Sequence, residues 1–305
     1  MGNLAYFNLH PYRDVQNLIV RFSPVLDARF YRDEVSADDS FNIYLFNSGR
    51  NYFLQTAEES IYLNDDMHSF AKGATQLLST KILNKSVVNY KYVVNFHTAF
   101  TNCFRLENKP ISTNNMTTMY GSYYNCSNIA GTPIVNKKVT NLIATYYNCG
   151  NLTGVPACNE NVTMMIGTYY NCINLTGEPT IGPKVKGITD AYYNCYSLEG
   201  NPANCNNVQV AINAYYNVSN LYGTFYWYEP YNTQASKINA TNMFYNRDYT
   251  RQLNIYVKTG SSIENALINH SASFGNIYGV GAIDWTYSTS YYYNTMYNTY
   301  IYNID

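Results

Sequence analysis

The stretch VTMMIGTYYNCINLTGEP, residues 162–179, decides the fold of this chain because it recurs with a fixed period. Cysteines recur at an interval of 23 residues up to Cys195, and the next step of 23 reaches Val218 in an otherwise matching segment. A constant period of this length is typical of stacked repeat proteins. The sequence therefore predicts at least six copies of one unit, marked by cysteines at a constant interval of 23: Cys103, Cys126, Cys149, Cys172 and Cys195.

Other residue types recur at fixed offsets from these cysteines. An Asn precedes each position, an aromatic residue lies three before it, and an aliphatic residue lies three after it, followed by Gly and Pro. A seventh, looser copy places Arg247 at the Cys position, a step of 29 beyond Val218. An insertion of six residues near 229–234 accounts for the longer step.

Each unit divides into two short elements. From Val162 to Cys172 the apolar residues recur at helical spacing, which predicts a short α- or 3₁₀-helix. From Leu175 to Thr180 the Gly-x-Pro pattern forbids a helix and predicts a short strand and turn. Because neither element can bury its apolar side alone, the units are expected to stack into an α/β solenoid with a parallel ladder.

The units Tyr-Tyr-Asn-Cys-x-Asn-Leu-Thr-Gly-x-Pro resemble the BspA-type leucine-rich repeats over about residues 96–250. Such repeats occur in bacterial surface proteins and in bacteriophage virion proteins. The Tyr- and Asn-rich composition and the Tyr-rich ending resemble the virion proteins, tail or head fibres, more closely. The chain differs from the usual leucine-rich repeat in having one Leu per unit, so the curvature stays open.

The repeats divide the chain into three predicted domains. Residues 1–95 hold 19 of the 39 charges and contain strand-like runs, so we expect an α+β or β domain that attaches and caps the stack. Residues 96–250 form the solenoid. Residues 251–305 start with a strand-like run at 253–258, continue with a helix from about Ser262 to Asn269, and end in Tyr-rich hairpins at 285–304, giving a β-rich C-terminal cap.

Two structural ladders are expected along the stack. The Cys position also accepts Val218 and Arg247, so it is interpreted as a buried small-residue position and not as a zinc site; a disulfide between neighbouring units is geometrically conceivable. The Asn position is interpreted as a column of stacked amides. The residues assigned to these ladders are Asn125, Cys126, Asn148, Cys149, Asn171, Cys172, Asn194 and Cys195.

Aromatic residues supply the candidate contact surface. One Tyr of each pair is expected to point into the core, and the second to line an outer stripe that suits protein or saccharide contact; alternatively, both are buried between units. The segment FYWYEPY, residues 225–231, is the densest aromatic patch and is interpreted as an inserted contact loop. The candidate residues are Tyr124, Tyr147, Tyr170, Tyr193, Phe225, Tyr226, Trp227, Tyr228 and Tyr231.

Composition and motifs exclude several function classes. The 19 basic and 20 acidic side chains nearly cancel, which disfavours nucleic-acid partners. No apolar run reaches the length of about 18 residues that predicts membrane insertion, and residues 1–20 lack the pattern of an export signal. No nucleophile elbow, phosphate loop or metal motif is present, so no catalytic residue, cofactor or metal is assigned. Glu160, Glu178, Asp190 and Glu199 occupy different positions in their units, which disfavours a polysaccharide-cleaving carboxylate pair.

The sequence thus predicts a non-enzymatic virion structural protein, made in the cytoplasm of the host bacterium and placed on the virion surface as a fibre, decoration or tail component. Its expected partners are other virion proteins, a host-surface glycan or protein, and further copies of itself, a trimer being what the resemblance implies. The alternative is a bacterial cell-surface adhesin with the same repeats.

Overall fold

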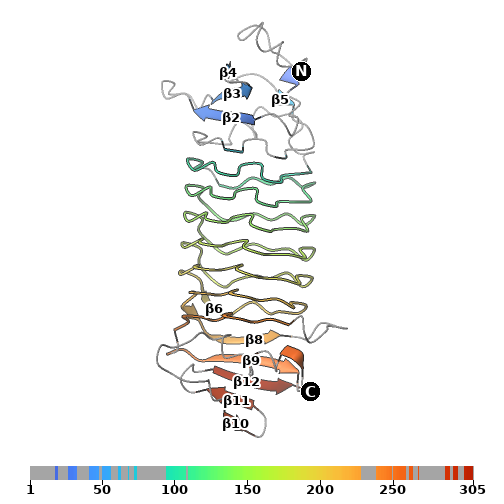
Figure 1. Cartoon of the computed structure of the whole chain (residues 1–305), viewed down its shortest axis with the longest axis vertical. Helices are drawn as coiled ribbons and strands as arrows, with labels where there is room; N and C mark the ends of the chain where they lie inside the picture. Colours follow the sequence, from blue (N-terminus) through green and yellow to red (C-terminus); the bar gives the residue numbers. More distant parts are fainter. Residues whose placement is uncertain are drawn as a thin grey trace.

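The computed structural model describes residues 94–107, 109–227, 238–248 and 250–258, together with flanking strands and the short segments 68, 72–73, 261–263 and 267. All structural statements concern these residues. The repeat units lie one on another as parallel coils (Figure 1). One parallel bridge per unit connects equivalent positions, in the order Asn95, Thr118, Asn141, Met164, Gly187, Val210 and Asn239. The last step, from Val210 to Asn239, is longer than the others, yet the equivalent positions still pair in parallel across it.

The segment that was expected to be a short helix consists of successive turns. Residues 162–172 contain no helical residue, and the backbone of Gly167 and Asn171 has positive φ, 58° and 56°. A left-handed residue every fourth position stops helix propagation. The expectation of a helix in each unit is therefore wrong for the described units. The helical spacing of the apolar residues arises from a turn pattern of similar length.

Successive backbone N–H groups of this segment donate alternately to the next unit and to a carbonyl of their own turn. The N–H of Ala144 donates to Ile166 O in the next unit at 2.8 Å, and Tyr146 donates to Thr168 O at 2.9 Å. The residue between them, Thr145, donates within its own turn to Leu142 O at 3.1 Å. Alternate amides thus close the turns and connect the units, which leaves few backbone donors unpaired.

The extended part of each unit pairs in parallel with the next. Single bridges join Gly131 to Leu152, Gly154 to Leu175 and Gly177 to Leu198, and the next step is the pair β6 (Glu199–Gly200) and β7 (Asn220–Leu221). The Gly is required for two reasons. At Gly154 φ is 77°, and a Cβ there would lie 2.8 Å from Thr132 Oγ1 in the preceding unit.

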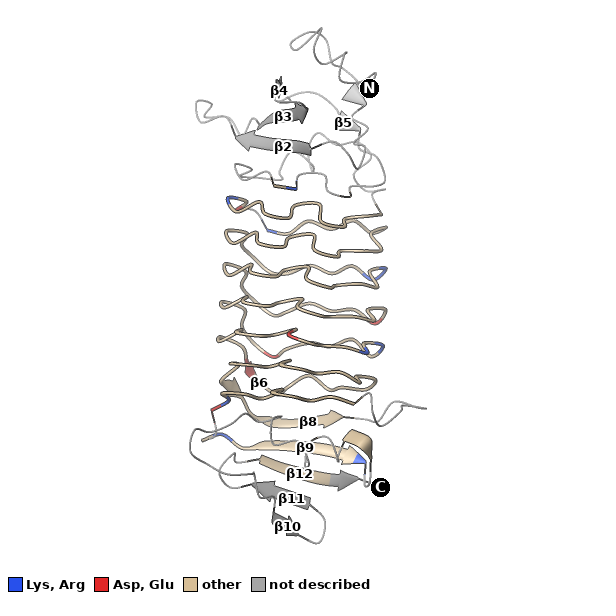
Figure 2. Ribbon diagram, viewed as in Figure 1, with Lys and Arg blue, Asp and Glu red and all other residues tan. Residues whose placement is uncertain are grey.

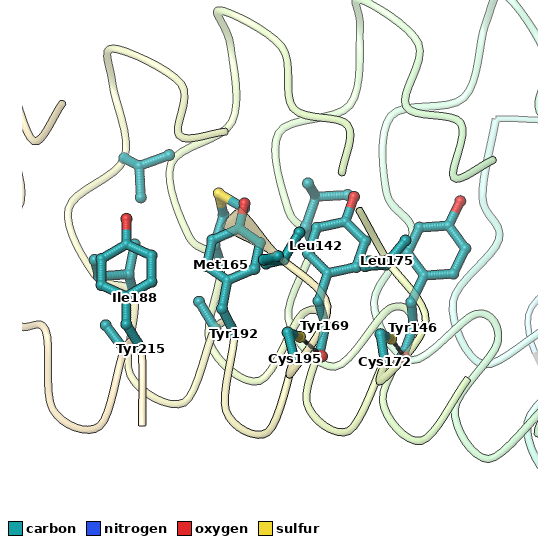
Figure 3. Close-up of a cluster of buried hydrophobic side chains, with 14 of the residues drawn as sticks. Leu142, Tyr146, Met165, Tyr169, Cys172, Leu175, Ile188, Tyr192, Cys195 and Tyr215 are labelled. Carbon is teal, nitrogen blue, oxygen red and sulfur yellow. Dashed lines mark hydrogen bonds between the residues drawn. The ribbon is translucent and has the colours of Figure 1, made fainter. Parts of the chain in front are cut away.

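The core is a set of columns that run along the stack (Figure 3). Each unit contributes the same fully buried set, for example Val162, Met165, Tyr169, Cys172 and Leu175. Because every unit has one apolar interior and two open ends, burial is completed only by the neighbouring units. The stability of the stack is therefore shared between units.

The C-terminal region forms a five-stranded sheet in the order β10-β11-β12-β9-β8. Its strands are β8 (Gly223–Trp227), β9 (Leu253–Lys258), β10 (Thr286–Ser288), β11 (Tyr291–Asn294) and β12 (Thr299–Ile304). β8, β9 and β12 are parallel, and β11 is antiparallel to both β10 and β12. The predicted strand at 253–258 is present as β9, and Ser262, Ile263 and Leu267 are helical. This sheet follows the last coil (Figure 1).

In the N-terminal region the structure describes mainly the backbone of strands. They are β1 (Leu18–Ile19), β2 (Asp27–Arg32), β3 (Phe41–Asn47), β4 (Arg50–Gln55) and β5 (Ile61–Tyr62). β2, β3 and β4 form an antiparallel sheet, and β1 pairs with β5 in parallel. No helix of the described chain is long and apolar enough to cross a membrane.

Candidate functional site: the tyrosine face

The second Tyr of each pair forms a column of stacked rings on the outside of the coils. Neighbouring ring centroids are 4.3–4.7 Å apart and the planes are within 16° of parallel. Each of these side chains is half-buried, whereas the first Tyr of the pair is fully buried. We call this set the outer column; its members are Tyr124, Tyr147, Tyr170, Tyr193, Tyr216 and Tyr245.

A ladder of side-chain amides accompanies the outer column. Asn171 Nδ2 donates to Asn148 Oδ1 at 2.8 Å, and Asn194 Nδ2 donates to Asn171 Oδ1 at 2.7 Å. The same bond continues in both directions, and every member has φ between 56° and 63°. Among residue types, Asn ranks second to Gly in adopting this conformation. Both the positive φ and the amide hydrogen bonds therefore favour Asn at this position. The amide ladder comprises Asn102, Asn125, Asn148, Asn171, Asn194, Asn217 and Asn246.

The first Tyr of each pair and the Cys have interior roles. Phe100, five tyrosines and Phe244 form a buried column with centroids 5.4–5.7 Å apart. The seven cysteines are free thiols, so the conceivable disulfide between neighbours is not formed. Cys149 Sγ donates to Tyr123 O at 3.0 Å, and burial raises the thiol pKa well above its usual value. These thiols are unreactive packing groups.

The segment that carries the outer column is almost free of charge. The segment of Tyr245 contains Arg247, which is buried, and Asp248. In the other five segments that carry the outer column, 118–127, 141–150, 164–173, 187–196 and 210–219, Asp190 is the single Asp, Glu, Lys or Arg. Its Oδ1 accepts a hydrogen bond from Asn213 Nδ2 at 2.9 Å. Most charges of the repeat region lie instead at the turns at either end of the coils (Figure 2). The half-exposed outer column, the amide ladder and the half-exposed Ile143, Ile166 and Ile212 together form an uncharged surface, the tyrosine face.

The phenols of Tyr147 and Tyr193 stay neutral over the physiological range. Partial burial, followed by repulsion from a neighbouring phenolate of Tyr170, raises the pKa of Tyr147 to about 12. Partial burial, followed by the phenolate of Tyr216, raises the pKa of Tyr193 to about 12 as well. Since an ordinary Tyr has a pKa near 10, these two hydroxyls keep their protons at any physiological pH, and their interaction with the hydroxyls of Tyr170 and Tyr216 contributes to the raised pKa.

The two ring columns show that the stack bends. Because neighbouring units are similar copies, the centroid distance between their equivalent rings measures how far apart the two units lie at that position. This displacement is 4.3–4.7 Å at the outer column and 5.4–5.7 Å at the buried column. The units are closer together on the side of the outer column, so the tyrosine face lies on the concave side.

Stacking within the outer column covers the ring faces and so limits which parts of each Tyr can contact a ligand. Tyr147, Tyr170 and Tyr193 each have a tyrosine ring against both faces. Sugar C–H groups therefore have no free ring face to pack on at the inner members of the column. Because the faces are covered while the side chains are half-exposed, ring edges and hydroxyls are the parts that meet solvent.

The described part of the expected aromatic contact loop, residues 225–227, belongs to strand β8. Phe225 and Trp227 have no exposed area, and Trp227 Nε1 donates to Val208 O at 3.0 Å. Both belong to β8, where side chains alternate between the two faces of the sheet, so Phe225 and Trp227 point inward. Tyr226 is half-buried and stacks on Tyr256 at 4.9 Å. Phe225 and Trp227 are thus excluded as contact residues, and Tyr228 and Tyr231 lie outside the described residues.

Three structural roles were missed from the sequence. The hydroxyl of Thr168 is buried and donates to Leu142 O at 2.9 Å, in the preceding unit. The hydroxyl of Tyr169 bonds to the backbone of Ala157, the residue after Pro156. Arg247 is 3% exposed and binds carbonyl oxygens and Thr299 Oγ1. The recurrence of Thr and Tyr at fixed positions could have indicated the roles of Thr168 and Tyr169. The replacement of Cys by Arg in the last unit could have indicated the role of Arg247.

Comparisons with known proteins leave the family open. No protein-family model, no curated protein and no solved structure matches the chain. Within the described part of the chain, no group of three or more His, Cys, Asp or Glu side chains is placed to hold a metal ion. The tyrosine face is therefore the candidate site on geometric grounds alone.

Proposed function

We propose that this chain is a non-enzymatic structural protein of a bacteriophage virion, a fibre, decoration or tail component. In this proposal residues 96–250 are a leucine-rich-repeat-like solenoid that serves as a scaffold for assembly and host contact. The charge-rich residues 1–95 attach it to the particle, and 251–305 cap its other end. The virion assignment rests on the resemblance of the Tyr-Tyr-Asn-Cys units to BspA-type repeats.

One observation carries the scaffold role: the recurring polar groups of each unit bond along the stack. Asn171 bonds to the units before and after it, Cys172 Sγ bonds to Tyr146 O, and Thr168 Oγ1 bonds to Leu142 O. Side chains that act in catalysis must instead converge on a site where a substrate can reach them. The repeated residues are thus committed to building a long regular support.

The tyrosine face supports the contact role. Interface centres are depleted in charge and enriched in Tyr, and this face has both properties over five units. The proposed partners are other virion proteins, further copies of the chain and a host-surface glycan or protein. The chain is made in the bacterial cytoplasm and displayed on the particle.

Antibody labelling of intact particles in the electron microscope tests the proposal. We expect label at one defined position of the virion, on the tail or on the head, and recovery of the chain from purified particles. Label on the envelope of uninfected bacteria would instead establish the adhesin alternative. Release of soluble oligosaccharides from host capsule by the purified chain would overturn the non-enzymatic assignment.

A further inference from the structure

We propose that the tyrosine face binds an extended neutral polysaccharide, which runs along the stack and is held by phenol hydroxyls and side-chain amides. This inference rests on the proposed scaffold and contact function and names the ligand class of that surface. The binding mode is hydrogen bonding to ring edges and hydroxyls, without stacking of sugars on aromatic faces.

The regularity of the face selects a regular ligand. The same phenol recurs every 4.3–4.7 Å over six units, and the same amide recurs beside it. A protein partner typically anchors through a few central hot-spot residues in pockets, which does not match a row of identical groups. A polymer with one repeating residue can present a matching group at every step. The concave curvature suits a chain that follows the stack over several units.

The absence of charge selects a neutral polymer. A nucleic acid requires Lys or Arg along its phosphates, and the single Lys or Arg in the segments that carry the outer column is Arg247, which is buried. A polyuronate or a sulfated polymer would have to place its anions on a surface that carries the half-exposed carboxylate of Asp190 and whose single Lys or Arg, Arg247, is buried. Tyr147 and Tyr193 have a pKa of about 12, so the face acquires no phenolate charge there at neutral pH.

The hydrogen-bonding capacity of the face matches sugar hydroxyls. A phenol hydroxyl donates one bond and accepts others, and a side-chain amide has two N–H groups and two lone pairs on oxygen. In the amide ladder Asn171 uses one N–H towards Asn148 and one lone pair towards Asn194. A second N–H and a second lone pair are left for a ligand at each unit, and a sugar hydroxyl can pair with either.

The test uses the full chain and a panel of immobilised polysaccharides: a neutral glucan, mannan and galactan, a polyuronate and a sulfated glycan. We expect binding to at least one neutral polymer. Its affinity should change little when salt rises from about 50 to about 200 mM, since no ion pairs form. Failure to bind every neutral member, or preferential salt-sensitive binding of an anionic member, overturns the proposal.

A triple variant tests the binding mode. Tyr147→Phe, Tyr170→Phe and Tyr193→Phe together keep the stacked rings and remove three hydroxyls, and we expect affinity to fall by about tenfold or more. The matched control is Tyr256→Phe, Tyr300→Phe and Tyr302→Phe, which changes stacked rings of the C-terminal sheet and should leave binding unchanged. Equal affinity of the wild type and the first variant overturns the proposal.

Unaltered circular dichroism and thermal melting of both variants separate loss of binding from loss of fold. Particle labelling is independent of these measurements. A chain that is found on the virion but binds no neutral polymer contradicts the ligand assignment alone. A chain that binds but is absent from the virion contradicts the proposed function alone.

Discussion

The phenol hydroxyl of Tyr169 donates to Ala157 O at 2.6 Å and accepts from Ala157 N–H at 3.0 Å. The same double contact joins the buried Tyr of other units to the residue after Pro: Tyr123 to Ile111, Tyr146 to Ile134 and Tyr192 to Thr180. It connects the two sides of a coil across its interior. The buried Tyr therefore replaces the backbone pairing that a tight coil cannot make there.

We expect Tyr169→Phe to lower the free energy of unfolding by about 1–3 kcal/mol, because the Ala157 N–H and C=O lose their partner. The comparison is Tyr215→Phe, since the buried Tyr215 hydroxyl interacts with the backbone of Ala203 but makes no hydrogen bond of normal geometry. Phe100 and Phe244 already occupy this column. Denaturant unfolding of both variants measures the difference, and equal losses would contradict the role of the Ala157 contact.

Substitutions of Asn171 separate its two roles. Asn171→Gly keeps a backbone suited to φ of 56° and loses two amide bonds, at a cost of about 1–2 kcal/mol. Asn171→Ala should cost about 1–2 kcal/mol more, because Ala disfavours the left-handed region. Chemical denaturation should rank wild type above Gly and Gly above Ala. Asn206→Ala, at an exposed position outside the ladder, is the control and should be neutral.

Two glycines of one unit test the close approach between coils. In Gly154→Ala the new Cβ lies 2.8 Å from Thr132 Oγ1 at φ of 77°, so we expect a loss of about 2 kcal/mol or more. In Gly150→Ala the Cβ makes an ordinary contact, 3.7 Å from Ile173 Cγ1. Thermal melting should show a lower Tm for the first variant and little change for the second. A similar Tm for both would show that the coils adjust freely at this point.

Alkaline pH should destabilise the stack through the outer column. Burial and neighbouring phenolates raise the pKa of Tyr147 and Tyr193 to about 12, above the value near 10 of an unfolded chain. The folded state therefore holds these protons more tightly. The associated stability is complete below about pH 10 and is lost as the pH rises towards 12. Phenolate absorbance and Tm measured in parallel should change together, and titration of every Tyr near pH 10 in the folded state would contradict this.

Arg247 connects the last coil to the C-terminal sheet. Its guanidinium donates to Leu221 O, Arg251 O and Thr299 Oγ1 at 3.3, 2.6 and 3.0 Å. Arg247→Met removes these bonds and leaves buried acceptors unpaired, so we expect a loss of about 3 kcal/mol. Hydrogen exchange should increase in β12. Arg251→Met, which removes a cation–π contact of 4.6 Å with Tyr222, should cost about 1 kcal/mol or less. Unchanged exchange in β12 would exclude the connecting role of Arg247.

The helix prediction was wrong because the spacing of the apolar residues fits two backbone conformations, a helix and a series of turns. Val162, Met165 and Tyr169 have helical spacing, yet Gly167 and Asn171 adopt positive φ and convert the segment into turns. A turn closed by an i to i−3 bond repeats its side-chain direction at nearly the same interval as a helix. Asn before each Cys was the available signal, because Asn tolerates the left-handed region. Periodicity alone does not separate the two conformations.

By itself the sequence determined the unit, its constant period, the insertion before the seventh copy and the columns of like residues. Repetition makes equivalent positions neighbours, so the Asn and Cys columns follow from spacing alone. Only the tertiary structure decided which surfaces are exposed. Phe225 and Trp227 are buried in β8, where Phe225 packs against Phe244 and Trp227 bonds to Val208 O, and the ring faces of the outer column are covered by the next unit. Exposure depends on what packs from outside a segment, and a repeat pattern contains no information about that.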